Sequence, residues 1–351
     1  MKKIFLGIAV SVLCLSGTVW AKSLPNVKIL AVGGTIAGVA STQEQSTSYK
    51  AGQLTVQTLI ESVPAMKKLA RITGEQYCNI GSGNLTDNDI LGLAKRVDSV
   101  LKEPGTDAVV ITHGTDTLAE TAWLLNRTVH SDKPIVLVGA MRPATAISAD
   151  GPANLLNAVR CAASEEAIGQ GALIVMNEEI HNARDVTKTD TTLVSAFQSP
   201  TLGAVGRIAA GSPVFFKKTL RKHTADSEFD LSRIKELPKV AIVYCHVGED
   251  ATMARAAVAS GAKGIIVAGT GNGTVSKHIF PTMEEAVKNG VPVVRSSRVP
   301  GGCVTTSKPS WDAAGFVRAG TLNPQKARIL LQLALTKTSD GNEIQKIFDR
   351  Y

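Results

Sequence analysis

The sequence predicts an α/β protein of two doubly wound domains, a larger N-terminal one and a smaller C-terminal one joined by a polar linker. Short β-branched runs such as Val109–Ile111 alternate with helix-like segments such as Leu118–Leu125, a pattern typical of parallel strands and crossover helices. At 351 residues the chain is long for a single hydrophobic core. We therefore expect an N-terminal domain over 22–214, a linker over 215–238, where polar and basic residues prevail, and a C-terminal domain over 239–351.

Residues 1–21 are typical of a secretory signal peptide. Lys2 and Lys3 precede an apolar run from Ile4 to Trp20, and Ala21 offers a small residue for cleavage. A retained membrane anchor is the alternative interpretation, because the run approaches spanning length. With the leader removed, we expect no membrane association.

Charge and cysteine content exclude several functions. The formal charge of +8 includes the two leader lysines, and aromatic residues make up only 4% of the chain. Without a basic block interleaved with aromatics, we expect no nucleic-acid binding. Four cysteines remain after cleavage and show no CxxC spacing, so we expect no metal site: they are Cys78, Cys161, Cys245 and Cys303. Pairing is open to them in an oxidising compartment, but buried free thiols are the simpler expectation.

The first mature strand, Val27–Val32, ends in the glycine-rich segment Gly33–Gly38. Its GGxxxG spacing differs from GxGxxG, and no acidic residue ends a second strand at the expected distance, which argues against a dinucleotide cofactor. The glycines instead leave the hydroxyl of Thr35 open to a small ligand. The polar segment Val39–Gly52, which contains Tyr49, predicts a mobile lid.

A second strand, near Gln76–Ile80, is expected to end in Gly81-Ser82-Gly83-Asn84. The Val109–Ile111 strand is followed by Gly114, Thr115 and Asp116. This position at the carboxyl end of a strand and the start of a helix is where α/β sheets bind ligands. Helix capping is the equally weighted alternative for Thr115 and Asp116.

The rest of the chain continues the alternation. Strands are expected at Pro134–Gly139, Leu173–Met176, Val240–Tyr244, Gly264–Ala268 and Val291–Val294, and helices at Thr55–Val63, Asp87–Leu101, from Asp150, Asp250–Ser260, Met283–Asn289 and Pro324–Leu335. The polar stretch Arg184–Thr189 places Lys188 among hydroxyl groups. A loop lysine is usually just solvated, but a desolvated one can act as a base.

These parts indicate acyl transfer. The strand ends that carry Thr35, Ser82 and Thr115-Asp116 are expected at one sheet edge, with Lys188 arriving from a later loop. No Ser-His-Asp order is visible, and His113 has no obvious partner. A threonine nucleophile, a hydroxyl activated by lysine and an oxyanion held by backbone N–H groups would fit the available side chains.

Two segments, Ala31–Gly38 and Ile111–Thr117, resemble the two signature motifs of the bacterial asparaginase/glutaminase family. The leader points to its periplasmic, type II branch. Further matches cover nearly the whole mature chain: Val138–Pro143, Ser148–Pro152, Asp185–Lys188, Arg295–Val299 and Leu322–Arg328.

The resemblance implies a periplasmic amidohydrolase that converts L-asparagine to L-aspartate and ammonia, with some action on L-glutamine. It also implies two α/β domains, a homotetramer with active sites at subunit interfaces, and no cofactor or metal. The residues that match the family's catalytic set are Thr35 as nucleophile, Tyr49 of the lid, and the triad of Thr115, Asp116 and Lys188, with lysine as base. Which threonine attacks first is left open.

For substrate binding, the resemblance implies that Ser82, beside Gly81, receives the α-carboxylate and that Asp116 meets the α-amino group. Asn272 matches an asparagine that a partner subunit donates.

Two departures from the family bear on the substrate. Gly83 stands where many members carry glutamine, and the loop Thr305–Asp312 contains no glutamate, with Asp312 as its one carboxylate. The alternatives to efficient catalysis are a periplasmic amino-acid-binding protein and a family member that binds without turnover. The departures also leave the preference between asparagine and glutamine open.

Overall fold

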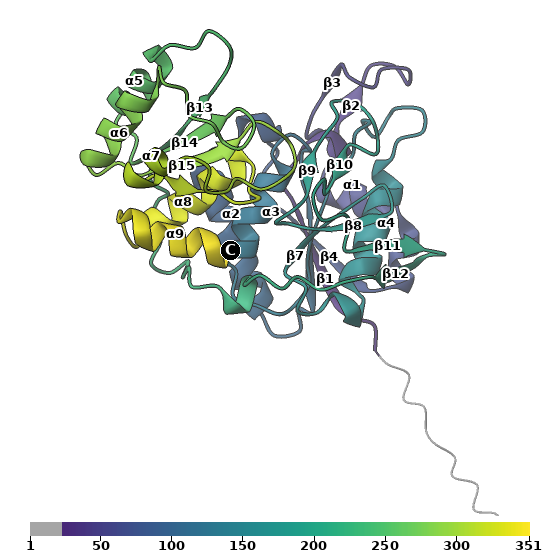
Figure 1. Cartoon of the computed structure of the whole chain (residues 1–351). Helices are drawn as coiled ribbons and strands as arrows, with labels where there is room; N and C mark the ends of the chain where they lie inside the picture. Colours follow the sequence, from purple (N-terminus) through teal and green to yellow (C-terminus); the bar gives the residue numbers. More distant parts are fainter. Residues whose placement is uncertain (1–22) are drawn as a thin grey trace, which may run out of the picture.

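The computed structural model describes residues 23–351 (Figure 1). The predicted signal peptide, residues 1–21, lies outside the described residues. From residue 23 onward, none of the helices is both long enough and apolar enough to cross a membrane.

The strands and helices have the following bounds. The strands are β1 (Asn26–Ala31), β2 (Val39–Ala40), β3 (Tyr49–Lys50), β4 (Arg71–Gln76), β5 (Ala108–Thr112), β6 (Ile135–Val138), β7 (Ala172–Met176), β8 (Glu179–Asn182), β9 (Thr187–Lys188), β10 (Phe197–Gln198), β11 (Gly206–Ala209), β12 (Ser212–Phe215), β13 (Val240–Tyr244), β14 (Gly264–Gly269), β15 (Val293–Ser297) and β16 (Val317–Arg318). The α-helices are α1 (Val56–Glu61), α2 (Asp87–Lys102), α3 (Leu118–Thr128), α4 (Gly151–Ala162), α5 (Thr252–Ala259), α6 (Phe280–Lys288), α7 (Pro309–Ala313), α8 (Pro324–Leu335) and α9 (Gly341–Arg350).

The N-terminal domain is built on an eight-stranded sheet with the order β12-β11-β8-β7-β6-β5-β1-β4. The strands from β7 to β4 pair in parallel, and β8, β11 and β12 extend the sheet with antiparallel pairs. Every residue of β5, β6 and β7 is buried, as expected for parallel strands that helices cover on both faces. The two-domain α/β class is confirmed, and the antiparallel extension is an addition to it.

The strand predicted near Gln76–Ile80 was wrong in position. The strand that pairs with β1 is β4, Arg71–Gln76, which lies at the sheet edge and has only exposed and half-buried residues. An edge strand of this kind needs no apolar run, so its polar sequence gave no periodic signal. Residues 77–80 instead form the connection that leads to Ser82.

Helices cover both faces of the N-terminal sheet. In Figure 1, α1 and α4 lie on the outer face, and α2 and α3 lie on the face toward the C-terminal domain. The expected helix Asp87–Leu101 is α2, which begins with a complete capping box between Thr86 and Asp89.

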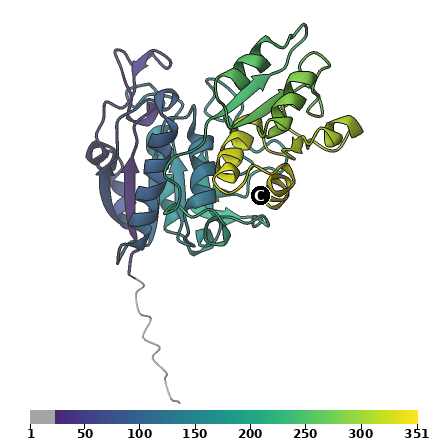
Figure 2. The same ribbon diagram turned by 90° about the vertical axis from the view of Figure 1, so that its left-hand side faces the viewer.

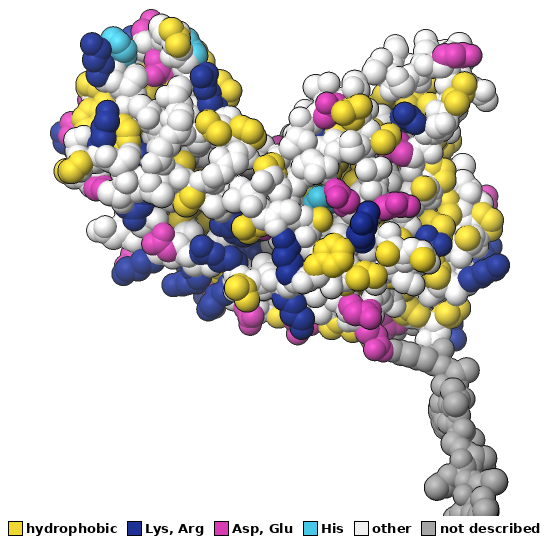
Figure 3. Space-filling model, turned by 45° about the vertical axis from the view of Figure 1, so that its right-hand side comes forward, with side chains coloured by type: hydrophobic (Ala, Val, Ile, Leu, Met, Phe, Trp, Pro, Cys, Tyr) yellow, Lys and Arg dark blue, Asp and Glu magenta, His cyan; other side chains and the backbone are white. Residues whose placement is uncertain are grey.

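The C-terminal domain contains a parallel sheet with the order β13-β14-β15-β16. Helices α5 and α6 pack against this sheet, and α8 packs between it and the N-terminal domain (Figure 2). One hydrophobic core joins the two domains, because Ile329 and Leu330 of α8 belong to the same buried cluster as Ile29 of β1. The Trp123 ring nitrogen donates to the backbone oxygen of Lys326 at 3.1 Å. The domains are thus fixed to each other, and the space-filling view shows a broad hollow above their junction (Figure 3).

The segment between β12 and β13 has no strand or α-helix, only a 3-10 turn at Thr224–Asp226. It is polar but not detached, because Phe229, Leu231 and Ile234 are buried in the shared core. The domain boundaries themselves stay a prediction.

In the described part of the chain, the four cysteines are free thiols. Cys161 and Cys245 are buried and Cys78 is half-buried, as expected of thiols in apolar segments. Cys303 is exposed, so the expectation of burial was wrong for this residue, which lies in a loop directly after Gly301 and Gly302.

Candidate functional site

Two glycine-containing loops meet at the carboxyl ends of β1 and β5. Gly34 has a φ of +84°, and a Cβ atom placed on it would lie 2.2 Å from the Cα of Gly114. Only glycine permits this backbone angle and this approach without displacement. The contact positions Thr35 at the start of a short 3-10 helix, Thr35–Ala37, with only 6% of the residue exposed.

The hydroxyl of Thr35 pairs with the phenol of Tyr49, at 2.5 Å between the oxygens. Tyr49 belongs to the β2–β3 hairpin, within the segment expected to be a lid. The hairpin is tied to its surroundings, since the Ala40 N–H donates to the Thr145 hydroxyl at 2.9 Å. A Cβ on Gly38 would lie 2.8 Å from the Tyr49 ring, so glycine there lets the ring reach Thr35.

Ser82 lies beside the loop that follows β5. The Asp116 backbone N–H donates to the Ser82 hydroxyl at 3.2 Å, and the Thr117 hydroxyl donates to the Ser82 backbone oxygen at 2.9 Å. Gly114 again allows close contact, because a Cβ there would lie 2.5 Å from the Ser82 hydroxyl. The N-cap residue of helix α3 is Thr117, and its side chain makes no capping hydrogen bond. Neither Thr115 nor Asp116 occupies the N-cap position, so the capping interpretation of these two residues was wrong.

Lys188 of β9 reaches the same loop from a later part of the chain. Its ammonium nitrogen lies 3.0 Å from the Thr115 hydroxyl and 2.8 Å from an Asp116 carboxylate oxygen. The lysine side chain is 20% exposed and the aspartate side chain 69%. Thr115 itself is buried. The lysine thus connects a buried hydroxyl to a carboxylate that faces solvent.

One pocket of about 270 Å³ is lined by both pairs, Thr35 with Tyr49 and Thr115 with Lys188, and by Asp116. The other residues of its lining are Ser46, Thr47, Met141, Arg142, Thr191 and Thr192. Sequence reasoning did not assign these residues to the site, although clustered hydroxyls in the lid and after Lys188 were a signal for it.

His113 has partners that the sequence did not reveal. Its Nδ1 lies 2.7 Å from the backbone oxygen of Gly114, and its Nε2 lies 3.0 Å from the Thr121 hydroxyl. Complete burial lowers the pKa of His113 to about 4. A neutral imidazole that donates from Nδ1 and accepts at Nε2 satisfies both contacts, so His113 supports the loop from beneath.

Three predicted site residues do not line the pocket. Gly81 and Ser82 lie next to it in the loop before α2, and a Cβ on the neighbouring Gly83 would meet open space. Asn272 follows β14 in the other domain, is exposed, and forms hydrogen bonds with Thr305. The Asp312 carboxylate lies 3.5 Å from the Arg318 guanidinium.

The fold is that of a two-domain α/β protein whose strand-end loops bring the hydroxyl groups of Thr35 and Thr115 to one pocket. Residues 26–221 match the family described as "Asparaginase, N-terminal", and residues 239–348 match "Glutaminase/Asparaginase C-terminal domain". The chain belongs to the asparaginase family and is an amidohydrolase, which confirms the resemblance seen in the sequence.

Similar proteins span almost the whole chain. It is 50% identical to "L-asparaginase 2" of Escherichia coli (strain K12) over 332 residues, 94% of each protein. It is 49% identical to "Probable L-asparaginase periplasmic" of Haemophilus influenzae, also over 94% of each. Among solved structures, "Probable Cytoplasmic L-asparaginase from Campylobacter jejuni" is similar, with a TM-score of 0.91, 47% identity, and coverage of 93% of this chain and 100% of that one.

Proposed function

We propose that this enzyme hydrolyses the side-chain amide of L-asparagine to give L-aspartate and ammonia, with some action on L-glutamine, through a threonine acyl-enzyme. One observation carries the proposal: two hydroxyl groups, each paired with a proton-transferring side chain, line the same pocket. These pairs are Thr35 with Tyr49, and Thr115 with Lys188. The family and the names of its similar members support the substrate.

In the first half of the reaction, Thr35 Oγ1 attacks the amide carbon of the substrate. Its proton passes to the Tyr49 oxygen, which lies within transfer distance, while the Tyr49 phenol gives up its own proton toward the leaving nitrogen. The tetrahedral intermediate then collapses, the carbon–nitrogen bond breaks, and the leaving nitrogen takes up a proton as ammonia. Backbone N–H groups of the glycine-containing loops are suited to hold the developing oxyanion.

In the second half, water attacks the threonine ester, the bond between the acyl carbon and Thr35 Oγ1 breaks, Oγ1 regains a proton that comes from the water, and aspartate is released. Lys188 acts as the base toward Thr115, which in turn orients or activates the water. Asp116 holds the lysine nitrogen in place. No cofactor or metal takes part in these steps.

We propose that two groups of residues bind the α-carboxylate and the α-ammonium group of the substrate. Ser82, with Gly81, would receive the α-carboxylate, and Asp116 would pair with the α-ammonium group. Asn272 lies outside the pocket of its own chain, so the proposal assigns it to the pocket of a second copy. That assignment requires an oligomer, and we propose a homotetramer.

We also propose export to the periplasm. The charged start, apolar run and small residue of 1–21 support it, as does the name of the Haemophilus influenzae relative. The Campylobacter jejuni structure is titled cytoplasmic, so relatives of similar identity differ in their stated compartment. Cell fractionation of the full chain tests this point, and an uncleaved cytosolic product would contradict it.

The experiment that tests the function is ammonia release by residues 22–351 with asparagine and glutamine in parallel. The variant Thr35→Ala should abolish release while keeping asparagine binding by calorimetry. Thr73→Ala, an exposed threonine of edge strand β4, is the matched control and should behave as the wild type. Binding without release by the wild type would instead support an amino-acid-binding protein, with Gly83 and the Thr305–Asp312 loop as the departures responsible.

A further inference from the structure

The Asn272 loop, residues 270–273 after β14, combines an exposed side chain with a tightly specified backbone. Gly271 and Gly273 on either side of Asn272 have φ angles of +50° and +65°. A Cβ on Gly273 would lie 2.8 Å from a Val304 methyl carbon and 3.1 Å from the Ser296 backbone oxygen. The loop is therefore shaped to present Asn272 against the segment that contains Val304.

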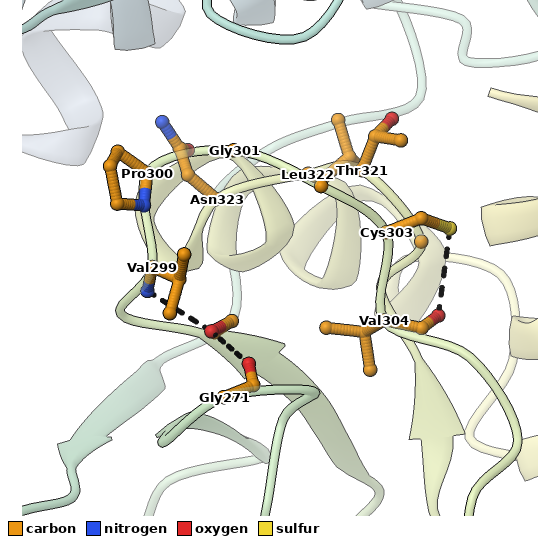
Figure 4. Close-up of a pocket in the computed structure, with 12 residues that line it drawn as sticks. Gly271, Val299, Pro300, Gly301, Cys303, Val304, Thr321, Leu322 and Asn323 are labelled. Carbon is orange, nitrogen blue, oxygen red and sulfur yellow. Dashed lines mark hydrogen bonds between the residues drawn. The ribbon is translucent and has the colours of Figure 1, made fainter.

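Hydrogen bonds hold the backbone of the loop at three successive residues. The Ser297 hydroxyl donates to the Gly271 oxygen at 2.6 Å and accepts from the Val299 N–H at 3.0 Å, at the edge of a neighbouring pocket (Figure 4). Arg295 donates to the oxygens of Asn272 and Gly273 at 3.4 and 3.1 Å. An exposed loop held in this way keeps a defined conformation.

The guanidinium of Arg295 links this loop to the segment that follows Val304. Its second terminal nitrogen donates to the Thr305 oxygen at 3.0 Å. The residue is completely buried, and its guanidinium lies 4.5 Å above the centre of the Trp311 ring, a favourable cation–π arrangement. Burying a charge is costly unless hydrogen bonds compensate for it. The two terminal nitrogens of Arg295 bind both loops at once, whereas its buried Nε has no hydrogen-bond partner.

The side chain of Asn272 is held as well. Its amide nitrogen donates to the Thr305 hydroxyl, and its amide oxygen accepts from the Thr305 N–H, both at 2.9 Å. These bonds fix which end of the amide points in which direction. A primary amide has a second N–H and a second lone pair, which stay available to a ligand.

We propose that Thr305 and Arg295 are positioning residues that preset the Asn272 amide for the substrate in the pocket of a second copy. This inference rests on the proposed function. An exposed asparagine normally samples several rotamers, and ordering it at the moment of binding lowers affinity. The Thr305 clamp orders the side chain beforehand, so the segment that lacks the family's glutamate still contributes to binding.

The test compares kcat and KM for asparagine in variants of one loop. Thr305→Val keeps the shape of the side chain but removes the hydroxyl, and we expect KM to rise about fivefold with kcat within about twofold of the wild type. Thr305→Ser should restore KM. The matched control is Thr306→Val, because the Thr306 hydroxyl binds Arg318 at 2.7 Å rather than Asn272, and it should leave both constants unchanged.

A mutant cycle with Asn272→Ala separates positioning from loop stability. If Thr305 acts through Asn272, the double variant should have the KM of Asn272→Ala alone. Arg295→Lys keeps the charge but not the planar fork, and should also raise KM while the variant remains folded by circular dichroism.

The outcomes distinguish the inference from the function on which it rests. A wild type that releases no ammonia overturns both. An active wild type with unchanged KM in Thr305→Val or in Asn272→Ala overturns the inference alone. So do additive effects in the double variant, or equal effects of Thr305→Val and Thr306→Val.

Discussion

The strand-end loops of the N-terminal domain and the Asn272 loop of the C-terminal domain solve a similar problem by different means. Both place a polar side chain after a parallel strand with the help of glycines that have positive φ angles. In the first region Thr35 and Thr115 are buried, and each has a hydrogen-bond partner within its own chain. In the second region Asn272 is exposed, and its partners only hold it in place.

The hydroxyl groups of the first region have their partners in the same chain, whereas the ligand proposed for Asn272 lies in a second copy. In the proposed mechanism each reactive hydroxyl needs a proton acceptor within hydrogen-bond reach, and Tyr49 and Lys188 of the same chain take that role. In its proposed role, the Asn272 amide needs only direction, which we infer that Thr305 and Arg295 provide in advance. Variants should therefore act on turnover in the first region and on affinity in the second.

The first prediction concerns the turnover of Lys188→Met. It removes the only nitrogen within 3.0 Å of the Thr115 hydroxyl that the described contacts provide, and we expect kcat for asparagine to fall about 10³-fold, the usual size of a general-base contribution. KM should change little. Steady-state ammonia release measures both constants.

The control for this variant is Lys277→Met, an exposed lysine of the C-terminal domain, which should match the wild type. Asn272→Ala should show the opposite division, with a higher KM and a nearly unchanged kcat. If Lys188→Met raised KM alone, the contrast between the two regions would be wrong.

The second prediction compares two glycines with positive φ angles. Ala at Gly34 would place its Cβ 2.2 Å from the Gly114 Cα, whereas a Cβ on Gly271 meets no atom within 4 Å. Gly271→Ala should cost about 1 kcal/mol of unfolding free energy from the backbone angle alone. Gly34→Ala must also separate two loops, and should cost about 3 kcal/mol or more.

Urea unfolding of the two variants measures this difference. Gly34→Ala should also lose ammonia release, because Thr35 follows directly in the displaced loop. Equal losses of stability would show that the contact between the two N-terminal loops is not tight.

The loops after β1 and β5 could be predicted from the sequence because their signals were local. A β-branched run that ends at glycine and threonine defined the β5 loop, and the glycines before Thr35 defined the β1 loop. The position of each strand within the sheet was harder to predict, since edge strand β4 is polar and its sequence shows no hydrophobic periodicity. The antiparallel strands β8, β11 and β12 are short, with four residues each, and their pairing depends on distant residues.

The side-chain contacts required the structure. Nothing in the sequence around His113 indicated Thr121 as its partner, although the two residues are only eight positions apart, on opposite sides of the start of helix α3. The clamp between Asn272 and Thr305 joins residues 33 positions apart, and Arg295 lies in a third segment. Such contacts arise from the crossing of loops at a sheet edge, which local patterns do not specify.

The third prediction concerns the histidine beneath the first region. Burial lowers the pKa of His113 to about 4 from its ordinary value of 6.5, so the unfolded chain binds the proton more tightly than the folded one. The resulting stability is present above pH 6.5 and is lost as the pH falls toward 4. The loss attributable to this group is up to about 3 kcal/mol of unfolding free energy.

His113→Gln removes that titration, so the variant's stability should fall less steeply between pH 6.5 and 4 than that of the wild type. Buried His181 has a pKa lowered to about 4 by the same cause and leaves a residual slope in the variant. His278→Gln, in an exposed position of the C-terminal domain, should keep the wild-type slope. Chemical unfolding at several pH values measures these slopes, and identical slopes for His113→Gln and His278→Gln would show that the loop beneath Thr115 tolerates a charged imidazole.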